Sequence, residues 1–134
     1  MRERKVILAI DDMSMNLRTI KVLLEKQFDV RLAKSGQMAI TIVNCERVAL
    51  ILLDIEMPGM SGFDFLEKVK DYPNAQDVPV IFISSHASPE LIKHASKYGS
   101  VKDYIIKPIT PEILEKKVYA ALNMSPLSEQ ESAL

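Results

Sequence analysis

Short apolar runs alternate along this chain with segments in which apolar residues recur every three or four positions. The runs occupy residues 5–10, 48–53, 80–83 and 104–106, and residues 28–32 form a fifth, half-polar run. Runs this short are typical of β-strands, whereas the periodic segments between them are typical of amphipathic helices. Strict alternation of the two indicates βαβ units, so we predict an α/β fold: a doubly wound, five-stranded parallel sheet with helices on both faces.

Two of the expected strands differ in a way that predicts their places in the sheet. Val48 to Leu53 is apolar on both faces, which indicates a central strand covered by helices on each side. Residues 28–32 alternate apolar and charged side chains, as expected for a half-exposed edge strand.

Residues that favour N-cap positions mark the helix starts. The predicted start residues, in chain order, are Ser14, Ser35, Ser61, Ser88 and Thr110. Gly99 is expected just beyond the end of the fourth helix. The first, second, third and last helices each have a predicted inner face of apolar residues. These are Met13, Leu17, Ile20 and Leu24 in the first helix, and Met38, Ala39, Ile42 and Val43 in the second. They are Phe65, Leu66 and Val69 in the third, and Leu114, Val118, Ala121 and Leu122 in the last.

Length and composition narrow the class of protein. The 134 residues suit one domain, expected over residues 1–123, and residues 124–134 turn to Ser, Pro, Glu and Gln, as in a tail or linker stub. With 17 basic and 18 acidic residues, the chain gives no reason to expect binding to nucleic acid or membrane. The single cysteine cannot form an internal disulfide, and no apolar run approaches the roughly 20 residues that span a bilayer. We expect a cytoplasmic protein.

Polar side chains follow four of the expected strands. Asp11-Asp12 follows the first, Asp54 the third, Ser84 the fourth and Lys107 the fifth. Parallel strands joined by helices end at the same edge of the sheet, so these side chains should emerge together there. If the first and third strands are neighbours across the point where the strand order reverses, the three carboxylates converge.

Such a cluster predicts chemistry on a phosphoryl group. Converging carboxylates repel unless a cation lies among them, and Mg²⁺ suits a few carboxylates, waters and phosphate oxygens. Lys107 adds a positive charge, Ser84 adds a hydroxyl donor, and a carboxylate can serve as nucleophile and form an aspartyl-phosphate. A cis peptide bond before Pro108 would turn Lys107 back toward the site.

Four ordered motifs resemble the response-regulator receiver family of two-component signalling. They are Asp11-Asp12, the stretch from Leu53 to Gly62 (LDIEMPGMSG), Ile83-Ser84, and the stretch from Asp103 to Pro108 (DYIIKP). The match runs from about Lys5 to Leu122. The resemblance implies a flavodoxin-like strand order, 2-1-3-4-5, and chemistry limited to self-phosphorylation and self-dephosphorylation rather than turnover of a separate substrate.

The resemblance also implies roles around the acidic cluster. Asp54 matches the phosphoacceptor, and Asp12 and Asp54 match direct ligands of Mg²⁺. Asp11 matches the carboxylate that binds the ion through water or assists, and Glu56 the residue that offers its backbone carbonyl.

Signalling roles follow from the same resemblance. Ser84 matches the switch hydroxyl that hydrogen-bonds the phosphoryl group, Lys107 the lysine that pairs with it, and Tyr104 the aromatic switch. The donor would be a phosphohistidine on a sensor histidine kinase or a histidine phosphotransfer protein. The output would be a population shift of the face formed by the fourth helix, fifth strand and fifth helix, through which relatives also form homodimers.

The chain departs from the family pattern in two places, and two variable positions flank the site. Ser85 stands where many members have Ala, and Glu56 and His86 occupy variable positions that tune the lifetime of the phosphate. Between Gly99 and Tyr104 the chain carries one residue more than usual.

Other interpretations remain open from the sequence. Asp11 and Asp12 also suit a turn, and Tyr104 also suits a buried edge-strand aromatic. A strand-end Asp phosphohydrolase would need a second Asp where Glu56 stands, and a flavodoxin-type binding module would need Ser and Thr where Asp11-Asp12 stands. A third alternative is a docking module that works independently of phosphorylation.

Overall fold

A computed structural model describes residues 4–86 and 88–124 and contains a five-stranded parallel sheet in the order β2-β1-β3-β4-β5. The strands are β1 (Val6–Ile10), β2 (Asp29–Ala33), β3 (Leu50–Asp54), β4 (Val80–Ser84) and β5 (Val101–Ile106). The predicted fold class and strand order are therefore confirmed. The proposed tail, residues 124–134, lies outside the described residues except for Met124.

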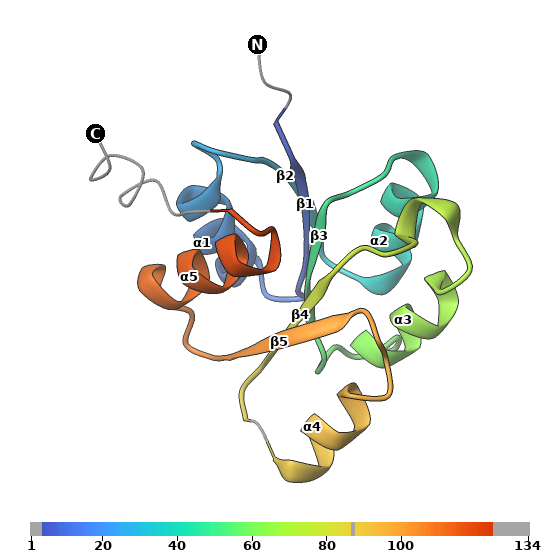
Figure 1. Ribbon diagram of the computed structural model, residues 1–134. Helices are drawn as coiled ribbons and strands as arrows, with labels where there is room; N and C mark the ends of the chain where they lie inside the picture. The colour runs from blue at the N-terminus through green and yellow to red at the C-terminus, as the bar shows by residue number, and fades with distance from the viewer. Residues whose placement is uncertain (1–3, 87, 125–134) are drawn as a thin grey trace.

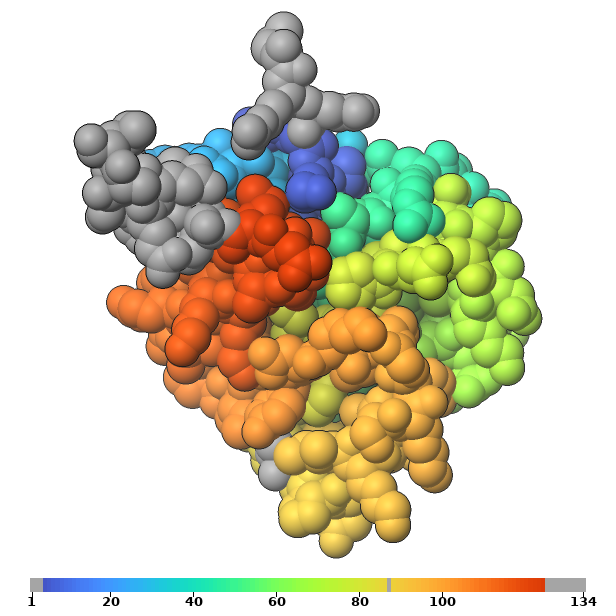
Figure 2. All heavy atoms as spheres, in the orientation of Figure 1, coloured from blue at the N-terminus to red at the C-terminus, as the bar shows by residue number. Residues whose placement is uncertain are grey.

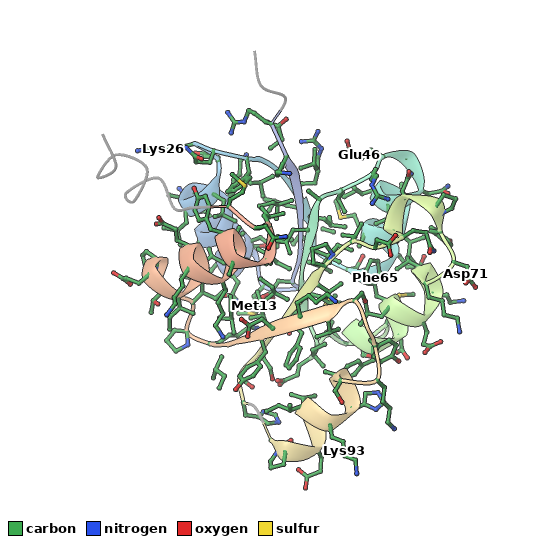
Figure 3. All side chains as sticks on the ribbon, viewed as in Figure 1. Met13, Lys26, Glu46, Phe65, Asp71 and Lys93 are labelled. Carbon is green, nitrogen blue, oxygen red and sulfur yellow. The ribbon has the colours of Figure 1, made fainter. Side chains whose placement is uncertain are left out.

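Helices cover both faces of the sheet (Figure 1). On one face lie α1 (Ser14–Leu24) and α5 (Pro111–Ala121). On the other lie α2 (Gly36–Cys45), α3 (Gly62–Val69) and α4 (Pro89–Ala95), and a short 3-10 turn, η1 (Pro73–Ala75), precedes β4. Phe65 of α3 is fully buried between its helix and the sheet (Figure 3). No helix within the described ranges has the length and apolar character needed to cross a bilayer.

The strand patterns place β3 and β4 at the centre. Every residue of both strands is buried, whereas four of the five residues of β2 are only partly buried, as the alternating pattern predicts. The predicted start of β3 at Val48 was wrong by two residues. Val48 is buried in the loop before the strand, while strand pairing begins where Leu50 lies opposite Ile7.

Four of the five predicted helix starts have side-chain caps. The hydroxyls of Ser35, Ser61, Ser88 and Thr110 each accept a hydrogen bond from a backbone N–H in the first turn. The predicted N-cap at Ser14 was wrong, because Met13 occupies that position without a side-chain bond. Met13 is also 54% exposed rather than on the inner face, and Figure 3 marks its position.

Two other predictions on the helices were wrong. Met38 of α2 is 48% exposed, because its side chain lies beside the backbone N–H of Lys34 instead of reaching the sheet. Helix α4 ends at Ala95, well before Gly99, because Lys97 and Tyr98 already donate to the carbonyls of His94 and Ala95 in a tightened turn.

A bulge interrupts the pairing of β5 with β4, in the segment where the sequence predicted an extra residue. Val80 pairs with Val101, whereas the next residue, Ile81, pairs with Asp103, so Lys102 has no partner across the ladder. Strand β5 consequently begins at Val101, three residues earlier than predicted. From Asp103 onward the register is regular, and it carries Tyr104 and the chain leading to Lys107 alongside β4.

Candidate functional site

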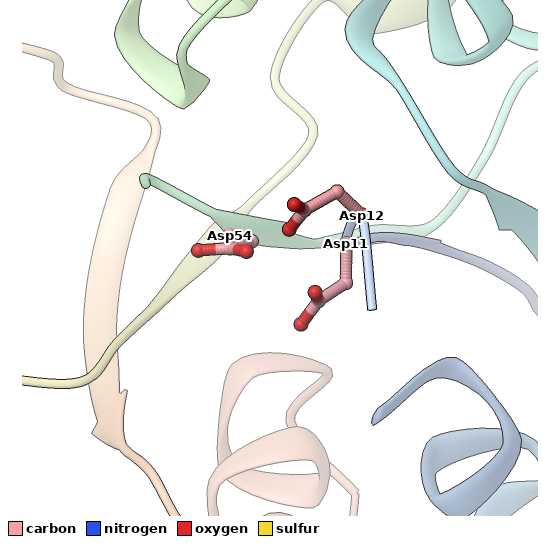
Figure 4. A group of neighbouring side chains, drawn as sticks. All are labelled: Asp11, Asp12 and Asp54. Carbon is pink, nitrogen blue, oxygen red and sulfur yellow. The ribbon is translucent and has the colours of Figure 1, made fainter. Parts of the chain in front are cut away.

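Three carboxylates meet at the carboxyl ends of β1 and β3 (Figure 4). Ile10 pairs with Leu53, so the residues that follow them, Asp11 and Asp54, emerge side by side from neighbouring strands. Asp11, Asp12 and Asp54 each offer an oxygen, and these oxygens lie within 4.8 Å of one another. Asp11 and Asp54 are 0% and 1% exposed, whereas Asp12 is partly exposed. The convergence predicted from the sequence is thus present.

The Asp11 carboxylate is fixed by the start of α1. Its Oδ1 accepts a hydrogen bond from the backbone N–H of Met13 at 2.8 Å, and its Oδ2 accepts one from the Asn16 amide at 3.1 Å. The bond from Met13 makes Asp11 a turn residue ahead of α1, where Met13 takes the N-cap position without a side-chain bond. The turn role left open for Asp11 is thus present, whereas its contact with Asn16 was not predicted.

The Asp54 carboxylate is held on both oxygens. Oδ1 accepts a hydrogen bond from the backbone N–H of Glu56 at 2.9 Å, and Oδ2 lies 3.4 Å from Lys107 Nζ. Burial raises the pKa of Asp54 to about 6. The hydrogen bond from the Glu56 N–H opposes this rise and the nearby Asp11 carboxylate adds to it, while the positive charge of Lys107 opposes it. At neutral pH Asp54 is therefore mostly ionised, as a nucleophile must be.

Lys107 reaches both buried carboxylates. Its Nζ lies 3.5 Å from Asp11 Oδ2 and 3.4 Å from Asp54 Oδ2. Its backbone N–H donates to the Ser84 carbonyl at 2.8 Å, and the Lys107–Pro108 peptide bond is cis. Burial disfavours the charged amine, but the two carboxylates outweigh it and raise the pKa of Lys107 above its ordinary value. Lys107 thus stays protonated beside Asp54.

The donor set fits a divalent cation. The three carboxyl groups outnumber the single ammonium, so the cluster has an excess of negative charge in a largely buried position. Its ligand atoms are hard oxygens, with no His or Cys in the cluster, and such sets favour Mg²⁺ or Ca²⁺ over the softer transition metals.

Ser84 lies beside the cluster, but a different carboxylate holds its hydroxyl. Ser84 is 1% exposed, and its Oγ donates a hydrogen bond to Glu56 Oε1. The pKa of Glu56 is lowered, chiefly by the hydrogen bond from Ser84. Burial of Glu56 opposes this shift, and hydrogen bonds from Ser85 add to it. The Glu56 side chain was not predicted to contact Ser84. The register offered a signal, because Asp54 pairs with Ile83 and so the loops after β3 and β4 run side by side.

Tyr104 lies one strand away from the acidic cluster. It is half-buried on β5, and its ring stacks on Phe82 of β4 with centroids 5.5 Å apart. Lys117 of α5 covers the ring, with Nζ 4.9 Å from its centroid, and donates to the Tyr104 carbonyl at 2.6 Å and to Asp103 Oδ1 at 3.0 Å. Tyr104 is therefore a partly buried aromatic on the edge strand β5, and its role as a switch stays a prediction.

Known proteins with similar sequences and folds share this arrangement of elements. The family model described as "Response regulator receiver domain" matches residues 7–119. The two-component response regulator ORR3 of Oryza sativa subsp. indica is 35% identical over 107 residues, which are 78% of this chain and 81% of that protein. A probable cyclic di-GMP phosphodiesterase of Vibrio cholerae is 33% identical over 87% of this chain, which spans only 26% of that protein's length.

Solved structures give the same result for the fold. The chemotaxis protein CheY4 of Vibrio cholerae superposes with a TM-score of 0.85 at 26% identity, covering 90% of this chain and 100% of that one. A CheY-like receiver domain protein from Methanospirillum hungatei JF-1 superposes with a TM-score of 0.81 at 29% identity, covering 98% and 100% of the two chains.

Proposed function

Because this chain belongs to the family of response regulator receiver domains, we propose that it accepts a phosphoryl group on Asp54 and relays that event to its surface. The observation that carries the proposal is the pairing of one buried, ionisable carboxylate with a lysine at 3.4 Å and two further carboxylates at the same sheet edge. That arrangement supplies a nucleophile, a charge that stabilises the phosphoryl group, and an acidic position for a cation.

The transfer we propose is an exchange of one bond for another. An ionised Asp54 oxygen forms a bond to phosphorus as the phosphorus–nitrogen bond of a phosphohistidine breaks, and the electron pair of that bond returns to the imidazole nitrogen. Lys107 stays protonated and faces the negative charge that the phosphoryl group brings to Asp54. Hydrolysis of the acyl phosphate by water restores Asp54, so the chain turns over only its own phosphate.

We propose that Mg²⁺ is held by the carboxylates of Asp11, Asp12 and Asp54 and by the backbone carbonyl of Glu56. When bound, the ion supplies charge neutralisation for the phosphoryl oxygens. Asp11 is preoriented for this role by Met13 and Asn16, whereas the partly exposed Asp12 is left free to adjust.

We propose that the α4–β5–α5 face, the surface of those three elements, carries the output. Figure 2 views the molecule from this side, with α5 in red, β5 in orange and α4 in yellow. Ile106 and Ile113 are 45% and 43% exposed there, beside a groove of about 370 Å³ along β5 and α5. Exposed apolar side chains flanked by Lys116 and Lys117 suit a protein partner, including a second copy of this chain.

The position of Glu56 favours this function over phosphohydrolase activity. A hydrolase of the type considered above needs a protonated carboxyl that donates to the leaving group at this position. The Glu56 carboxylate instead accepts hydrogen bonds from Ser84 and Ser85, and its pKa is lowered, chiefly by the bond from Ser84. It is therefore poorly suited to act as a general acid.

Acetyl phosphate tests the proposal without a cognate kinase. Wild-type protein incubated with acetyl phosphate and Mg²⁺ should gain one phosphoryl group by intact mass spectrometry. The adduct should be absent when the metal is chelated and in Asp54→Asn, whereas Asp71→Asn, which changes an exposed aspartate, should retain it. An unchanged wild-type mass would refute the proposal.

A further inference from the structure

The Glu56 carboxylate ties the loop after β3 to the loop after β4. Ser84 Oγ donates to Oε1, the backbone N–H of Ser85 donates to Oε1 at 3.1 Å, and Ser85 Oγ donates to Oε2 at 3.0 Å. His86 Nδ1 lies 3.6 Å from the same Oε1. The Glu56 side chain thus contacts three consecutive residues at the end of β4, which are Ser84, Ser85 and His86.

The Ser84 hydroxyl has no proton left for a second acceptor. A hydroxyl carries one proton to donate, and here that proton goes to Glu56 while Oγ accepts from the backbone N–H of His86 at 3.3 Å. The resemblance to receiver domains implies that Ser84 donates to a phosphoryl oxygen on Asp54, and we propose the same bond here. A phosphoryl group and an ionised carboxylate are both acceptors, so they compete for this proton.

We infer that Glu56 is a positioning residue: its carboxylate holds Ser84 in the unphosphorylated arrangement and releases it when Asp54 carries a phosphoryl group. This inference rests on the proposed function of Asp54. Ser85 makes release feasible, because its N–H and hydroxyl still satisfy Glu56 after Ser84 has turned away. The two interactions of Ser84 are coupled, and such coupling is reciprocal. A phosphoryl group weakens the bond between Glu56 and Ser84 by some factor, and Glu56 must weaken the binding of the phosphoryl group by that same factor.

Beryllium fluoride, a mimic of a phosphoryl group on a carboxylate, measures this factor at equilibrium. It is titrated into the protein at saturating Mg²⁺ and followed by two-dimensional NMR. Removing the competing acceptor in Glu56→Ala should tighten binding about tenfold, as expected for one hydrogen bond to a charged group. Glu56→Gln should give a smaller gain because a neutral amide is a weaker acceptor. Glu25→Ala, which removes an exposed carboxylate at the end of α1, is the control and should leave binding unchanged.

A double-mutant cycle separates positioning of Ser84 from simple charge repulsion. In a Ser84→Ala background, Glu56→Ala should change the affinity for beryllium fluoride by less than about twofold, because there is no hydroxyl left to compete for. A full gain in that background would mean that Glu56 acts through its charge alone and would overturn the inference. No gain in the wild-type background would overturn it equally.

The proposed function can fail separately from the inference. If the wild type accepts phosphoryl from acetyl phosphate and binds beryllium fluoride, yet the Ser84-dependent gain is missing, only the inference on Glu56 is wrong. If the wild type does neither, both are wrong.

Discussion

The acidic edge, where Asp11, Asp12 and Asp54 lie, and the α4–β5–α5 face are held in different ways, although only β4 separates β3 from β5. Asp11 and Asp54 are almost fully buried, and each of their carboxylate oxygens faces a backbone, amide or lysine donor. Tyr104, in contrast, is half-buried and rests between one aromatic ring and one lysine. A nucleophile that must stay in one geometry benefits from saturated, buried contacts, whereas a surface that must differ between two states benefits from contacts that can be exchanged.

The end of β4 connects the two regions. Ser84, its last residue, bonds Glu56 through its hydroxyl, and its carbonyl accepts a hydrogen bond from the backbone N–H of Lys107, just after β5. A rearrangement of Ser84 can therefore reach both the lysine and the strand that carries Tyr104. The comparison predicts that changes at the edge alter chemistry and coupling, whereas changes at the face alter only the readout.

Loss of Lys107 should have the largest effect. Lys107→Ala removes the ammonium that faces both buried carboxylates, so phosphorylation should no longer be communicated to the α4–β5–α5 face. NMR spectra with Mg²⁺, with and without beryllium fluoride, should show shifts at Asp54 in this variant but none at Tyr104. Lys102→Ala, at an exposed lysine of β5, should behave as wild type. Undiminished shifts at Tyr104 in Lys107→Ala would show that coupling bypasses the lysine.

Neutralising Asp54 should stabilise the metal-free protein, chiefly at neutral pH. The pKa of Asp54 is about 6 in the fold, against an ordinary value of 3.8. The folded state therefore binds this proton more tightly than the unfolded state, and the contribution of Asp54 to wild-type stability falls as pH rises from about 4 to about 6. Asp54→Asn has no carboxyl group to ionise at this position, so its free energy of unfolding should exceed that of the wild type by about 1 to 3 kcal/mol at pH 7.5.

Urea unfolding in chelator checks this prediction, with Asp71→Asn as the matched control on an exposed aspartate. The gain for Asp54→Asn should be much smaller at pH 4, where the wild-type carboxyl is protonated in the fold and only about half ionised in the unfolded chain. A gain that is equal at both pH values would point to a cause other than the ionisation of Asp54.

The smallest effect is expected at Lys117. Lys117→Gln removes the cation over the Tyr104 ring and the ion pair with Asp103, which should cost about 1 kcal/mol of folding free energy. Tyr104 should become more mobile, seen as broadened ring signals by NMR, while the yield of the phosphoryl adduct stays unchanged. Lys116→Gln, at the exposed neighbouring position, should do neither. A reduced adduct yield in Lys117→Gln would place this lysine in the chemistry instead of the readout.

The acidic edge could be predicted from the sequence because it depends on topology alone. Once the strands are known to be parallel, the residues that follow them must share an edge, and Asp11, Asp54 and Lys107 are found together there. The half-exposed character of β2 and four helix caps were predictable for a similar reason, since each depends on a local pattern.

The features that could not be predicted depend on which of several possible partners a polar group bonds. Met13 rather than Ser14 takes the N-cap position of α1, and the Glu56 carboxylate accepts from Ser84; a sequence pattern does not rank such alternatives. The bulge at Lys102 and the early end of α4 at Ala95 likewise depend on how neighbouring segments pair, which lies beyond the period of any one element.

Chemical trapping of the phosphorylated residue tests the central claim most directly. Borohydride reduces an acyl phosphate to an alcohol, so protein treated with acetyl phosphate and Mg²⁺, then with borohydride, should carry homoserine at position 54 when its peptides are sequenced by mass spectrometry. Reduction at Asp11 or Asp12, or at none of the three, would contradict the assignment of Asp54 as the phosphoacceptor.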